Sequence, residues 1–223
     1  MKPFEFFGCI ELRQILGKKA EDEKQLLDLL DEVPLDSVYY HTHGYFLRHK
    51  YMLGAYSNDF ANWAAIEVRD RVLGERLGVL DPYDFDSMEA LRDEIIAVID
   101  DHLTKLKMVP RMGYGEPFHF MQSRVVAIPT GLAARTLEEF RGALARVDAS
   151  SIYYHAFEAR MRLNRGEGDF VFWFREALGL AELADRFRKI DPYMFSLEQL
   201  RTRLLVLLDE ALAKGGNGRG HPA

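Results

Sequence analysis

The sequence predicts a mainly α-helical protein with a small β element, formed by tandem duplication of one helical unit whose two copies pack with pseudo-twofold symmetry. The first observation is a repeat, because the motif SVYYH at 37–41 returns 114 positions later as SIYYH at 151–155. The second is spacing, because leucines and aromatic residues recur every three or four positions, as on one face of a helix. The third is size, since a unit of roughly 100 residues is a normal domain.

The correspondence between the two halves extends beyond this motif. DFANW at 59–63 matches DFVFW at 169–173, and DPYDF at 81–85 matches DPYMF at 191–195. We therefore predict a first helical repeat at 1–107, a linker at 108–117, a second helical repeat at 118–213 and a mobile tail at 214–223. Prolines and glycines indicate the linker, and a glycine-rich composition indicates the tail.

Each predicted repeat opens with alternating phenylalanines, Phe4-x-Phe6 in the first half and Phe118-x-Phe120 in the second. Such alternation predicts a short, half-buried strand. A glycine follows in each half, at positions 17 and 131, and we expect it to end the strand.

Capping residues and apolar spacing predict the first two helices of each repeat. The first helix spans about 22–33 and 137–147, and the capping-box spacing of Thr136 and Glu139 marks its start in the second half. The tyrosine–histidine motif lies on the second helix. Asp36 and Ser150 stand before it as N-caps, and neither proline nor glycine interrupts 151–163.

Three further helices complete each predicted repeat. Asn58-Asp59 and Asp169 are the expected caps of the third helix, which carries a tryptophan in both halves. The fourth helix spans about 71–80 and 180–190 and ends at an Asp-Pro-Tyr turn. The last helix spans 88–103 and 197–212.

Composition narrows the class of protein. A chain of 223 residues with 48% apolar content can bury a substantial core. Its net charge of -6 is modest and its charges are interspersed, so we expect no nucleic-acid partner. A single cysteine, Cys9, suits a reducing compartment, and no stretch is long and apolar enough to span a bilayer. We expect a soluble, cytoplasmic protein.

The motifs also carry a family resemblance. The segments SVYYHTH at 37–43 and HAFEARMRL at 155–163 resemble those of an uncharacterised prokaryotic family, a domain of unknown function. The resemblance covers about residues 4–212. It implies an association with sugar-nucleotide glycosyltransferases, hence a link to carbohydrate metabolism and a glycosyltransferase as protein partner. It implies no activity, cofactor or catalytic residue.

Ionisable residues on the motif helix are the candidate site. Positions seven apart share a helix face, which aligns His41 with Arg48 and His155 with Arg162. The candidates for binding a small polar ligand are Tyr40, His41, Arg48, Tyr154, His155, Glu158 and Arg162.

Pseudo-twofold packing would bring the two histidines together. His41, His155 and Glu158 would then suit a transition metal that activates water or oxygen. A buried histidine that hydrogen-bonds to a neighbouring group is the alternative interpretation, and the sequence leaves both open. The paired tryptophans could likewise stack on a sugar or base, or belong to the core.

Two functions remain at this stage. The first is a non-catalytic binding or regulatory protein, which agrees with the repetition of core residue types. The second is a metal-dependent or acid–base enzyme with a site between the repeats. The sequence contains no phosphate-binding glycine loop and no Gly-x-Ser-x-Gly nucleophile motif. Reaction, cofactor and oligomeric state are not predicted.

Overall fold

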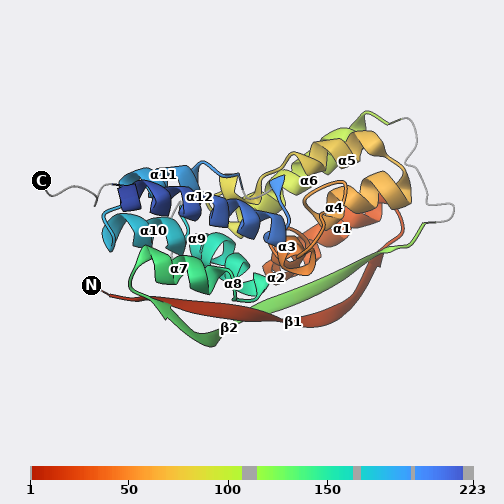
Figure 1. Cartoon of the computed structure of the whole chain (residues 1–223). Coiled ribbons are helices and arrows are strands. Elements are labelled where there is room, and N and C mark those ends of the chain that lie inside the picture. The colour runs from red at the N-terminus through yellow and green to blue at the C-terminus, as the bar shows by residue number, and fades with distance from the viewer. Residues whose placement is uncertain (1, 107–114, 163–166, 192–193, 218–223) are drawn as a thin grey trace, which may run out of the picture. The chain divides into compact units, whose positions relative to one another are not determined.

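The computed structural model describes residues 2–106, 115–162, 167–191 and 194–217 (Figure 1). Two strands, β1 (Phe4–Ala20) and β2 (Phe118–Ala134), each contain 17 residues and form an antiparallel sheet. The predicted mainly α class is therefore wrong, because the protein is mixed α and β. Both strands are much longer than predicted. They continue through Gly17 and Gly131, whose φ angles of 72° and 73° suit a residue without a Cβ.

The chain forms two compact units that are not consecutive stretches of sequence. Unit 1 comprises residues 1–10, 49–52 and 126–223, and unit 2 comprises 11–48 and 53–125. These units differ from the predicted repeats because the start of β1 packs with the C-terminal helices and the start of β2 with the N-terminal ones. The described residues therefore do not show the predicted tandem duplication or pseudo-twofold packing.

Unit 2 contains the helices α1 to α6. Their bounds are α1 Glu23–Glu32, α2 Leu35–His41, α3 Tyr45–Arg48, α4 Asp59–Trp63, α5 Arg71–Gly78 and α6 Met88–Thr104. A π-helical turn, Ala64–Val68, follows α4, and a 3-10 turn, Pro82–Asp84, precedes α6. Side-chain caps start several of these helices, among them Asp22, Asn58, Asp70 and Ser87. Their apolar faces enclose Phe118 and Phe120 of β2.

Unit 1 contains the helices α7 to α12. Their bounds are α7 Leu137–Leu144, α8 Ala149–Tyr153, α9 Ala159–Arg162, α10 Asp169–Glu176, α11 Ala181–Arg188 and α12 Leu197–Asn217. A π-helical turn, Tyr154–Glu158, joins α8 to α9, so the helix predicted for this motif is present with one widened turn. Phe4 and Phe6 of β1 pack against Phe140 in this core, with ring centroids 5.2 and 5.1 Å away.

Two predicted segments fall at or beyond the edge of the described chain. Most of the predicted linker, residues 107–114, lies outside the described residues. The predicted tail begins inside α12, which reaches Asn217, and its remainder also lies outside. No helix among the described residues combines the length and the hydropathy that a membrane crossing requires.

Candidate functional site

His41 joins a helix of unit 2 to strand β2. It is the last residue of α2, is only 4% exposed, and its Nδ1 lies 2.8 Å from Oδ2 of Asp59. Its Nε2 accepts a hydrogen bond from the backbone N–H of Met121 at 3.1 Å. Because a backbone N–H can only donate, the ring is neutral and donates from Nδ1 to Asp59. Burial lowers the pKa of His41, in agreement with the neutral form.

His155 makes the same contacts in unit 1. Its Nδ1 lies 2.8 Å from Oδ2 of Asp169, and its Nε2 accepts from the backbone N–H of Phe7 in β1 at 2.9 Å. It belongs to the π-helical turn, a local widening that is frequent at functional positions. Each unit thus holds one strand through a histidine–aspartate pair.

A tryptophan provides a second anchor in each unit. Nε1 of Trp63 donates to the carbonyl of Glu116 at 2.9 Å, and Nε1 of Trp173 donates to the carbonyl of Lys2 at 3.2 Å. Both indole rings are 6% exposed. The tryptophans are therefore mostly buried in the core, and each also lines a pocket with its remaining surface.

The two aspartates do not have the capping role predicted for them. In the predicted pair Asn58-Asp59 it is Asn58 that caps the helix, since its side chain accepts from the N–H of Ala61, and in unit 1 the N-cap position is Gly168. Asp59 and Asp169 are instead the first residues of α4 and α10, and their carboxylates bind the histidines. A carboxylate beside a helix N-terminus is also favoured by the helix dipole.

The hydrogen bonds of the two histidines are evidence against the predicted metal site. Both ring nitrogens of His41 and His155 are engaged by protein groups, so neither directs a lone pair at an ion. His41 belongs to unit 2, whereas His155 and the half-buried Glu158 belong to unit 1. The metal role remains a prediction that this hydrogen bonding disfavours.

The other candidates are distributed over both units. In unit 2, the guanidinium of Arg48 lies 3.8 Å from the ring centroid of Tyr40 and also binds Asp59. His41 and Arg48 therefore meet through a shared carboxylate, although they lie on separate helices rather than on one face. In unit 1, Tyr154 packs edge-on against His155, and the side chain of Arg162 lies outside the described residues.

A pocket of about 620 Å³ lies beside the histidine–aspartate pair of unit 1. Its apolar walls are Pro3, Phe4, Phe7, Tyr154, Phe172 and Trp173, and its charged residues are Lys2, Glu5, Asp169 and Glu176. This size, with mostly aromatic walls and a few polar groups, is typical of a small-molecule site.

Phe172 is one of the residues of this pocket that sequence reasoning missed. Its ring is 39% exposed, whereas the neighbouring Phe170, Val171, Trp173 and Phe174 are buried. The signal was available, because an aromatic residue on the outward face of an otherwise amphipathic helix has no core to fill.

Unit 2 has a smaller and more polar pocket at the corresponding histidine. Its volume is about 400 Å³, and its polar lining includes Arg48, Asn62, Glu67, Glu116 and His119. The two pockets therefore differ in the residues that line them, whereas the histidine–aspartate pair beside each pocket is the same.

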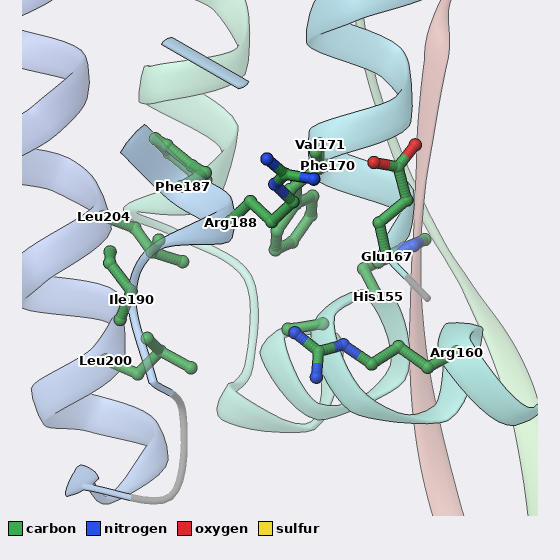
Figure 2. Close-up of a pocket in the computed structure, with 12 residues that line it drawn as sticks. His155, Arg160, Glu167, Phe170, Val171, Phe187, Arg188, Ile190, Leu200 and Leu204 are labelled. Atoms are coloured by element: carbon green, nitrogen blue, oxygen red, sulfur yellow. The ribbon is translucent and has the colours of Figure 1, made fainter. Parts of the chain in front are cut away.

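A third cavity lies within unit 1 and is lined by His155, Arg160, Glu167 and a group of apolar residues. Figure 2 shows Ile190, Leu200 and Leu204 on one side of it, with Glu167 and Arg160 on the other. Its volume of about 40 Å³ accommodates a few water molecules at most. It is too small for an organic ligand.

The fold and these contacts define a mixed α and β protein with two units, each of which anchors one strand through a buried histidine, an aspartate and a tryptophan. The chain belongs to DUF5752, a family of unknown function, whose model matches residues 1–209. The predicted resemblance to an uncharacterised family is thereby confirmed.

One solved structure is similar over almost the whole chain. OrfY from Thermoproteus tenax has 26% sequence identity and a TM-score of 0.75, and the match covers 94% of this chain and 95% of that one. None of the curated proteins compared with the chain matches it.

Proposed function

We propose that this protein is a non-catalytic binding module that holds a small ligand in the pocket beside Trp173. The observation that carries the proposal is the pocket of about 620 Å³, in which Phe172 presents a partly exposed ring. An acid–base role receives less support, because His155 already donates to Asp169 and accepts from Phe7. A proton shuttle needs a ring nitrogen within reach of the substrate.

The charges around the pocket disfavour an anionic ligand. Lys2 is opposed by Glu5 and Glu176, while the carboxylate of Asp169 is engaged by His155. The balance is negative, so an anionic ligand would be repelled. The aromatic walls favour a ligand with an apolar face. A neutral saccharide combines such a face with hydroxyl groups, in agreement with the carbohydrate link that the family resemblance implies.

The test is calorimetric titration of the full chain with glucose, maltose and glucose 6-phosphate. We expect a neutral sugar to bind and the phosphate to bind more weakly. Phe172→Ala should weaken binding about tenfold, the effect of losing one aromatic contact of roughly 1.5 kcal/mol. The matched control is Val206→Ala, which removes another partly exposed apolar side chain of unit 1, outside the pocket. Equal affinity of both variants would contradict the proposal.

Two further expectations belong to this proposal. A glycosyltransferase as protein partner rests on the family resemblance alone and stays a prediction, as does a cytoplasmic location. Mixing the full chain with such an enzyme and measuring complex formation by analytical ultracentrifugation tests the first.

A further inference from the structure

Unit 2 contains a second cluster of ionisable side chains, formed by Glu23, Asp70 and His102. Glu23 is the first residue of α1, Asp70 is the N-cap of α5, and His102 lies in the last turn of α6. One possible ligand atom from each residue lies within 4.8 Å of the others. Three separate helices therefore direct two carboxylates and an imidazole to one point.

Glu23 is the unusual member of this cluster. Its side chain has no exposed surface, and neither carboxylate oxygen has a hydrogen-bond partner among the described residues. A buried, unpaired carboxylate is strongly unfavourable in its charged form. Burial, followed by the nearby charges of Asp70 and Asp22, raises the pKa of Glu23 to about 7. Such a group needs either a proton or a cation.

Asp70 and His102 are held in place beside it. Oδ1 of Asp70 accepts from the N–H of Leu73 at 2.8 Å, and its Oδ2 lies 2.7 Å from Nε2 of His102. The two side chains are 11% and 8% exposed. Among the described residues, neither lysine nor arginine forms an ion pair with Glu23 or Asp70. The cluster thus holds two carboxylates, and His102 is the only basic side chain that the described residues bring against them.

The same places in unit 1 carry apolar residues. Leu137, the first residue of α7, takes the place of Glu23, and Leu180, the N-cap of α11, takes the place of Asp70. Counted from the start of each helix, position 102 of α6 corresponds to position 211 of α12, which is alanine. Helices of this kind can therefore pack without the three polar side chains. Asp70 has a role in the fold as the cap of α5 and as the partner of His102, whereas the buried carboxylate of Glu23 has none among the described residues.

We propose that Glu23, Asp70 and His102 bind a divalent first-row transition ion, for which Zn²⁺ and Mn²⁺ are the natural probes. One imidazole nitrogen and two carboxylates form a donor set that such ions accept, with water completing the coordination. The double positive charge offsets the two carboxylates. The bound ion would connect α1, α5 and α6, so its role is structural, and it is independent of the pocket beside Trp173.

The experiment uses the full chain after removal of metals by chelation. Calorimetric titration with ZnCl₂ and MnCl₂ at pH 7.5 should give one tight site, and the EPR signal of Mn²⁺ should report its immobilisation. Glu23→Gln should lower the affinity at least tenfold, because an amide is a poor ligand for these ions. Glu89→Gln is the matched control, since Glu89 is an exposed carboxylate on α6, and it should bind as the wild type does.

Stability of the metal-free variants separates binding from folding. Glu23→Gln removes the buried charge, so at pH 7.5 we expect its melting temperature without metal to equal or exceed that of the wild type. We also expect that adding Zn²⁺ raises the melting temperature of the wild type but not that of this variant. His102→Gln is the second variant and should lose the same increase. Lack of metal uptake by the wild type would overturn the proposal. Undiminished binding by both variants would also overturn it and would identify surface binding only.

Discussion

Units 1 and 2 anchor their strands in the same way but differ in what surrounds the anchor. His155 with Asp169 and His41 with Asp59 have equivalent hydrogen bonds, each to a backbone N–H of a strand. Both neighbouring pockets have aromatic walls, but the pocket in unit 1 is larger and the pocket in unit 2 has more polar residues in its lining. The comparison distinguishes the residues that stabilise the fold in both units from the residues that line a pocket and differ between the units. It also explains why the most repeated motif of the sequence is not itself a convincing site.

The largest expected effect comes from breaking either anchor. His155→Ala would remove one hydrogen bond to the carboxylate of Asp169 and one from the N–H of Phe7, and it would create a cavity. We expect a loss of about 3 kcal/mol in the free energy of unfolding. His41→Ala should cost a similar amount, because its contacts are equivalent. Urea denaturation followed by circular dichroism measures both.

The exposed His119 provides the control for these substitutions, since His119→Ala should change the stability by less than 0.5 kcal/mol. A loss below about 1 kcal/mol in only one of the two anchor variants would contradict the equivalence of the units.

Acid stability should distinguish unit 2 from unit 1. His43 is buried, and burial lowers its pKa to about 3 from the ordinary value of 6.5. The unfolded chain therefore takes up a proton below pH 6.5 that the folded chain does not accept until about pH 3. The stability that His43 supports is complete above pH 6.5 and is lost as the pH falls. We expect a loss of roughly 2 kcal/mol between pH 7 and pH 5.

The matched variant is His43→Phe. His43 stacks on Tyr39 with centroids 5.5 Å apart, and Phe157 of unit 1 stacks on Tyr153 at 5.6 Å. Phenylalanine should therefore fit the same place without titrating. Urea midpoints measured at several pH values should fall less steeply in this variant than in the wild type. An unchanged slope would mean that other groups determine the acid sensitivity.

The helices could be predicted from the sequence because their signals are local. Thr136, Ser87 and Ser196 cap helices whose starts agree with the prediction to within one residue. The strands were underestimated for the opposite reason. Most of β1 from Ile10 to Lys19 is exposed, so its residues show no alternation between a buried and a solvent face.

The candidate site could be predicted only in part. The sequence selected His41 and Arg48 as neighbours, but it could not show that Asp59 joins them, because an aspartate at a helix start is usually a cap. The sequence also could not show which segments of the chain form each unit. Hydrogen bonds such as that from Phe7 to His155 connect positions 148 apart, and no local pattern encodes such a pairing.

The smallest expected effect concerns the glycines that both strands contain. Gly17 and Gly131 have φ angles of 72° and 73°, and a Cβ at either would meet no atom within 4 Å. Gly17→Ala and Gly131→Ala should each cost about 1 kcal/mol from backbone strain alone. Gly142→Ala in helix α7, where the added methyl also meets nothing, should instead stabilise the protein by roughly 0.5–1 kcal/mol. Thermal unfolding of the three variants checks the signs, and unequal costs at 17 and 131 would show that the backbone relaxes to a different extent in the two strands.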